Sequence, residues 1–86
     1  MSDDDEIALA KSLPAGARRA LLAMTDEYVL PGRDTFNASA AFNLSWIARS
    51  YGGLAKSRVL KGGPAYRLTH LGQRIQDRLL ARKQQP

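Results

Sequence analysis

Two segments joined by a glycine-rich turn constrain the fold of this 86-residue chain more than any other feature. Residues 54–60 and residues 65–69 each alternate in side-chain character, as half-exposed strands do. The intervening Lys61-Gly62-Gly63-Pro64 predicts a tight turn, because paired glycines adopt positive φ angles without steric cost. A lone hairpin is barely stable in water, so we expect its inner face to pack on helices. The side chains predicted to point inward are Tyr66 and Leu68, and Arg67 is predicted to point outward.

Apolar residues at spacings of three and four predict three helices, over residues 13–25, 38–51 and 70–83. Gly52-Gly53 ends the second of these helices, and the Thr69 side chain caps the third. The side chains predicted to be buried on the three helices are Leu13, Ala17, Leu21, Met24, Ala40, Leu44, Ile47, Ala48, Tyr51, Leu71, Ile75 and Leu79.

The rest of the chain is less regular. Residues 28–30 form a short β-prone run closed by Pro31-Gly32, long enough for a brief edge strand. Asp34 and Asn37 are alternative caps for the second helix. Residues 1–12 begin acidic, and they form either a frayed tail or a short helix that packs on the body.

This order of elements predicts a compact α+β unit: helix, short strand or turn, helix, strand, turn, strand, helix. A chain of this length has room for one core. We assign residues 1–12 to an N-terminal acidic segment, residues 13–83 to the folded domain and residues 84–86 to a tail.

The composition gives little support for an enzyme or a metal protein. Cysteine is absent and His70 is the one histidine, so an ordinary Cys/His metal set cannot form. Asp26, Glu27 and Asp34 suit turn and cap positions better than an acid–base pair. We expect no catalytic residue, no cofactor and no metal. The acidic N-terminus does not resemble a secretory signal and no apolar run is long enough to cross a bilayer, so we expect a cytoplasmic protein without membrane contact.

The distribution of charge favours a polyanionic partner. The formal net charge is +5, and four of the eight acidic residues lie within residues 3–6. Nucleic acid suits the basic second half of the chain, because Lys and Arg that neutralise phosphates release counterions. A solvated surface that keeps a small protein in solution is the alternative explanation. From residue 49 onward a single acid, Asp77, stands against nine basic residues: Arg49, Lys56, Arg58, Lys61, Arg67, Arg74, Arg78, Arg82 and Lys83.

The sequence Tyr66-Arg67-Leu68-Thr69-His70-Leu71-Gly72, after Gly62-Gly63-Pro64, resembles the second wing strand and following helix of winged-helix regulators. Residues 52–55 resemble the passage from the recognition helix into the first wing strand, and residues 14–22 resemble the opening helix. The similarity is to the multiple-antibiotic-resistance regulator (MarR) superfamily, in the abbreviated form of small phage and bacterial proteins, and covers residues 13–82.

The resemblance implies a winged helix with a three-helix core, a β-hairpin wing in the C-terminal half and a closing helix. It also implies a DNA-binding protein, such as a small transcription regulator, although the motif marks a fold rather than a function. The segment between Met24 and Ala38 is short for the first helix of a helix-turn-helix, so the presence of that helix stays open.

A winged helix on duplex DNA inserts its recognition helix in the major groove and contacts the backbone with its wing. Here that helix is residues 38–51 and the wing is residues 54–68. Asn pairs with adenine and Arg with guanine in the groove, and wing cations contact phosphates. The residues expected to contact double-stranded DNA are Ser39, Asn43, Arg49, Lys56, Arg58, Lys61 and Arg67.

The alternative function is a winged-helix protein-interaction module, such as a phage-type accessory factor that binds an acidic partner protein; a homodimer is also compatible with the sequence. Its contact surface would be Phe42, Trp46 and the last helix. We expect Trp46 to pack on the core or the hairpin, but exposure of both aromatics would make the protein interface the stronger hypothesis. RNA binding has less support, since no aromatic-rich strand signature is present. The stripe Arg74, Arg78 and Arg82 is a second basic surface, a partner face or a solvated face.

Overall fold

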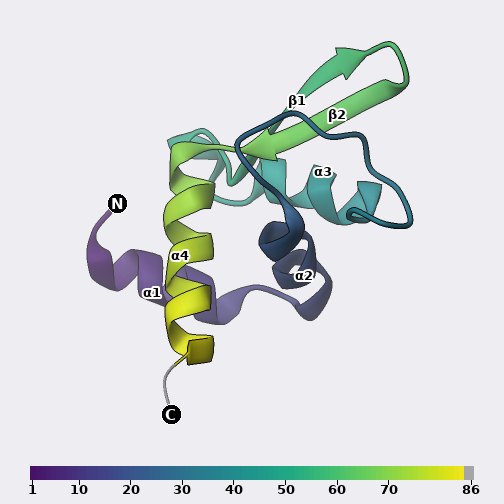
Figure 1. Cartoon of the computed structure of the whole chain (residues 1–86). Coiled ribbons are helices and arrows are strands. Elements are labelled where there is room, and N and C mark those ends of the chain that lie inside the picture. The colour runs from purple at the N-terminus through teal and green to yellow at the C-terminus, as the bar shows by residue number, and fades with distance from the viewer. Residues whose placement is uncertain (85–86) are drawn as a thin grey trace.

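The described residues fold into four α-helices and one two-stranded antiparallel hairpin, which confirms the α+β class (Figure 1). The computed structural model describes the backbone of residues 1–84 and the side chains of residues 1–81. None of the helices within this part of the chain is long and apolar enough to cross a membrane. The elements are α1 (Asp3–Ser12), α2 (Ala15–Ala23), α3 (Ala38–Trp46), a 3₁₀ turn (Arg49–Tyr51), β1 (Ala55–Leu60), β2 (Gly63–Leu68) and α4 (His70–Gln84).

The hairpin pairs Ala55 with Leu68 and has a tight turn at its tip, but the turn is shorter than predicted, because Gly63 and Pro64 belong to β2 and pair with Leu60 and Val59. Tyr66 and Leu68 are buried, as expected for the inner face. Val29 forms an isolated antiparallel bridge with Tyr66 on the edge of β2 that faces away from β1. The Val29 N–H donates to the Tyr66 carbonyl at 3.1 Å, and the Tyr66 N–H donates to the Val29 carbonyl at 3.0 Å. The brief edge strand predicted at residues 28–30 is therefore present as a single bridge.

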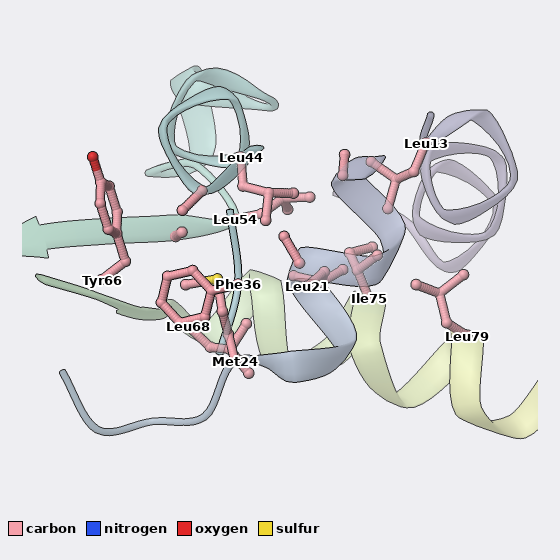
Figure 2. Packing of buried hydrophobic residues seen from close by; sticks show 14 of the residues in the cluster. Leu13, Leu21, Met24, Phe36, Leu44, Leu54, Tyr66, Leu68, Ile75 and Leu79 are labelled. Carbon is pink, nitrogen blue, oxygen red and sulfur yellow. The ribbon is translucent and has the colours of Figure 1, made fainter. Parts of the chain in front are cut away.

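One apolar core lies between the helices and the root of the hairpin (Figure 2). Leu21 of α2, Leu44 of α3 and Ile75 of α4 are fully buried in it, as their helical spacing predicted. Phe36, from the loop before α3, closes one side with its ring edge-on to Tyr66 at a centroid distance of 6.4 Å. Leu13, Ala17, Met24 and Leu79 are also buried as predicted.

The second predicted helix is wrong at its C-terminal end, because α3 stops at Trp46 rather than at Tyr51. The Leu44 carbonyl, which a continuing helix would pair with the N–H of Ala48, instead accepts the N–H of Leu54 at 3.0 Å. Leu54 is fully buried, so its packing draws the chain back toward the core, and Ala48 takes a left-handed conformation with φ 55°. Tyr51, predicted to be buried, is consequently 57% exposed.

The acidic N-terminus is a helix that packs on the body, the second of the two alternatives open from the sequence. Its helix α1 packs across α4 (Figure 1), and it carries Glu6 to a site that is 1% exposed. The Glu6 carboxylate accepts from Arg74 Nε at 3.3 Å and from Arg78 Nε at 3.0 Å, and Asp3 pairs with Arg78 Nη2 at 3.0 Å. Arg74 and Arg78 of the last helix therefore belong to an ion-pair network within the molecule. The side chain of Arg82 and residues 85–86 of the predicted tail lie outside the described residues.

Replacing Glu6 by glutamine is expected to lower the free energy of unfolding by about 1–3 kcal/mol, because the hydrogen bonds from two guanidinium groups lose their charged acceptor. The matched control is Asp4→Asn, which removes an acid from the same helical turn at an exposed position and should change stability by less than about 0.5 kcal/mol. Urea unfolding of both variants measures the difference. Equal stability of the two variants would contradict a stabilising role for the Glu6 network.

Thr69 and Gly72 fasten the start of α4 to the chain that enters the hairpin. The Thr69 hydroxyl caps the helix by accepting the Gly72 N–H at 3.0 Å, as predicted, and it donates to the Gly53 carbonyl at 2.7 Å. The Thr69 N–H donates to the Leu54 carbonyl at 3.2 Å. Gly72 packs so closely that an added Cβ would stand 1.9 Å from the Leu54 oxygen. The Leu-Thr-x-x-Gly motif is thus explained by packing between backbone segments.

Candidate functional site

Three of the predicted DNA-contacting residues share one face of the hairpin. Lys56 stands opposite Arg67 in the register, and Arg58, two residues along β1, projects from the same side. Tyr66 and Leu68 occupy the opposite side and point into the core. We call Lys56, Arg58 and Arg67 the basic sheet face; Lys61 adds a fourth, exposed cation at the hairpin tip.

Tyr28 supports the basic sheet face, although the sequence did not identify it as a site residue. Its ring centroid lies 5.1 Å from the Arg67 guanidinium carbon and 6.0 Å from that of Arg58, distances at which a cation and an aromatic ring attract. Arg67 Nη1 is further positioned by donation to the Asp26 carbonyl at 3.4 Å. Tyr28 precedes the bridged Val29, so strand alternation places it on the outer side of the sheet. Strand alternation over residues 28–30 was therefore the sequence pattern that could have identified Tyr28 as a neighbour of these arginines.

No ion pair within the described residues involves a cation of the basic sheet face, although Asp26 lines a pocket together with Lys56 and Arg67. The ion pairs among the described residues all join α1 to α4, and none involves Lys56, Arg58, Lys61 or Arg67. The contact between Arg67 and Asp26 uses the backbone carbonyl and leaves the guanidinium charge intact. This face therefore offers a concentrated positive charge to a partner.

The exposed side of α3 carries two aromatic rings. Phe42 is 52% exposed and Trp46 is 57% exposed, so Trp46 is not part of the core, although it lines a groove beside β1 of the hairpin. The two rings meet edge to face with centroids 6.3 Å apart. Arg49 lies over Trp46 at 4.7 Å and donates to the Ser45 carbonyl at 3.2 Å, which fixes its guanidinium against the helix end. We call Phe42, Trp46 and Arg49 the aromatic face.

The structure divides the predicted DNA-contacting residues between these two surfaces. Ser39 and Asn43 are exposed on α3 next to the aromatic face, and Arg49 belongs to it. α3 packs on the core side of the hairpin, whereas the basic sheet face looks away from the core (Figure 1). Lys56 stands between them, since it also lines a groove of about 350 Å³ between α3 and β1.

Comparison of the chain with protein-family models, with curated proteins and with solved structures finds no match. The resemblance to winged-helix regulators therefore rests on the motif residues, and the order of elements is compatible with a winged-helix-like arrangement. A single α-helix, α3, lies between the bridge at Val29 and strand β1. The described segment between Met24 and Ala38 holds no helix, so the first helix of a helix-turn-helix, which the sequence left open, is absent there.

Proposed function

We propose that this chain is a winged-helix protein of the MarR type that binds double-stranded DNA chiefly with its hairpin. The observation that carries the proposal is the basic sheet face: Lys56, Arg58 and Arg67 lie on one outward side of the sheet, free of acidic partners among the described residues. Cations so placed contact phosphates irrespective of the base sequence. Lys61 extends this contact to the hairpin tip, where a wing meets the DNA backbone.

The proposal gives α3 a small part in base reading. An Asn43 contact with adenine in the major groove would carry Phe42 and Trp46 to the same groove, since all three side chains share the exposed side of the helix. Exposed aromatic residues beside an arginine are typical of protein interfaces. The exposure of both rings thus favours protein binding as a second function of the molecule, located on α3. The two functions are compatible in one regulator, which would bind DNA with its hairpin and a partner protein with α3.

A salt titration on random-sequence duplex DNA tests the main proposal. If all four cations of the hairpin contact phosphates, the logarithm of the binding constant should fall with the logarithm of salt concentration with a slope of about −3 to −4. Affinity should then drop about 100-fold between 50 and 200 mM salt. Fluorescence anisotropy of a labelled duplex gives the constant at each concentration. Absence of binding at the lowest salt, with the folded protein, overturns the proposal.

A further inference from the structure

The outer edge of β1 exposes unpaired backbone groups. Tyr66 uses both its N–H and its carbonyl to pair with Val29, so these groups point away from β1. Ser57, which stands opposite Tyr66, therefore forms a pair without hydrogen bonds, and its own N–H and carbonyl point away from β2. The same holds two residues further on for Val59. No bond to this edge from elsewhere in the described residues is found.

The aromatic face borders this free edge. The groove of about 350 Å³ between α3 and β1 is lined by Phe42 and Trp46 on the helix and by Ser57 on the strand. Ser57 and Val59 project on the side of the sheet that faces the core and α3, whereas Lys56 and Arg58 project on the other side. A strand added to the edge would thus meet aromatic rings on one side and cations on the other.

These surroundings specify the chemistry of an added strand. Successive residues of a strand point to opposite sides, so apolar side chains would cover Phe42 and Trp46 while the alternate ones stand beside Lys56 and Arg58. Acidic side chains are complementary to those two cations. We propose that the free edge of β1 binds an extended segment of a partner protein, in which acidic and apolar residues alternate, as an additional antiparallel strand.

A second copy of this chain fits the edge less well. Two β1 edges paired with one another would bring Lys56 and Arg58 close to the same residues of the other copy, and like charges on neighbouring strands are destabilising. Lysine on an edge strand is a known protection against such self-pairing. An acidic segment turns the same cations into favourable neighbours. The backbone edge and the aromatic side of the sheet take no part in the proposed DNA contact, whereas Lys56 and Arg58 serve both proposals.

Trp46, the single tryptophan of the chain, reports the interaction directly. The probe is a synthetic peptide of four Glu-Val repeats with blocked ends, titrated into the full chain. We expect a saturable change in Trp46 emission. A peptide of four Lys-Val repeats should bind about 10-fold more weakly or worse, because its cations meet Lys56 and Arg58.

Ser57→Pro isolates the edge hydrogen bond. The Ser57 N–H points outward, so proline removes a donor to the partner and leaves the β1–β2 ladder intact. We expect this variant to bind the Glu-Val peptide about 10-fold more weakly or worse, while Ser57→Ala, which keeps the N–H, binds as the parent does. The Ser57→Pro variant should retain the far-ultraviolet circular dichroism and the DNA affinity of the parent. If it fails to fold, the N-methylated Glu-Val peptide on the parent chain makes the same test, since the donor is then blocked on the peptide.

Three results overturn the proposal. Undiminished binding by folded Ser57→Pro, or by the N-methylated peptide, excludes strand addition. Equal binding of the Lys-Val and Glu-Val peptides excludes the acidic specificity. A dimer of the parent in size-exclusion chromatography with light scattering, converted to a monomer by Ser57→Pro, assigns the edge to a second copy instead.

Discussion

Replacing Gly72 by alanine is expected to destabilise the protein by on the order of 3–5 kcal/mol, which is a large part of the stability of a domain of this size. The ideal Cβ would stand 1.9 Å from the Leu54 carbonyl oxygen and 2.9 Å from the Leu54 carbonyl carbon. Both atoms belong to the backbone, so a side-chain rotation cannot relieve the clash. The start of α4 or the chain at Gly53-Leu54 has to move, and the Thr69 contacts to these two residues are lost with it.

The sign of this effect is opposite to that expected from helix propensity. Alanine is favoured over glycine inside a helix by about 1 kcal/mol, so propensity alone predicts that Gly72→Ala stabilises α4. Gly16→Ala is the matched control, because Gly16 also lies in a helix, and its added Cβ would have nothing within 4 Å. That variant should gain about 0.5–1 kcal/mol.

Thermal unfolding followed by circular dichroism distinguishes the two glycine variants. The Gly72→Ala midpoint should fall by about 15–30 °C, or the folded state should be lost, whereas the Gly16→Ala midpoint should rise by a few degrees. A Gly72→Ala midpoint within about 5 °C of the parent would show that the Leu54 segment moves away at little cost. The close packing of Gly72 would then not explain the motif.

The parts of the fold that local chemistry determines could be predicted from the sequence. Alternation placed Tyr66 and Leu68 on the inner face, and a hydroxyl before an apolar run identified Thr69 as a cap. The end of α3 could not be predicted in this way. Its periodicity continues to Tyr51, but the burial of Leu54 takes the Leu44 carbonyl from the helix, and that is a contact between residues ten positions apart.

The sequence predicted which residues belong to the candidate site better than it predicted how they are arranged in space. Alternation alone places Lys56 and Arg58 on one side of the strand, yet only the docked hairpin shows that this side faces away from α3. The count of basic residues from residue 49 onward also overestimated the number of cations that are available to a partner. Arg74 and Arg78 are paired with acids of α1, about 70 residues earlier in the chain, and no local pattern indicates such a pairing.

Reversing Arg58 and Lys61 to glutamate together is expected to weaken binding to random duplex DNA by about 100-fold at 50 mM salt and to reduce the magnitude of the salt slope by about 2. Each single reversal should produce roughly half of this effect on the logarithmic scale. Both side chains are exposed and neither residue has a positive φ, so the fold should be unaffected. The loss should be similar for all DNA sequences, because phosphate contacts carry no base information.

Lys11→Glu is the control that separates a local contact from the general charge of the protein. Lys11 is exposed at the end of α1, an element that packs on α4 rather than on the hairpin, and its reversal changes the net charge as much as Arg58→Glu does. If the basic sheet face binds the backbone, Lys11→Glu should weaken binding less than about 3-fold and leave the slope unchanged. Equal losses for Lys11→Glu and Arg58→Glu would mean that net charge alone attracts DNA. Asn43→Ala should likewise have little effect on random duplex affinity, because the proposed DNA contact lies on the other side of the hairpin from α3.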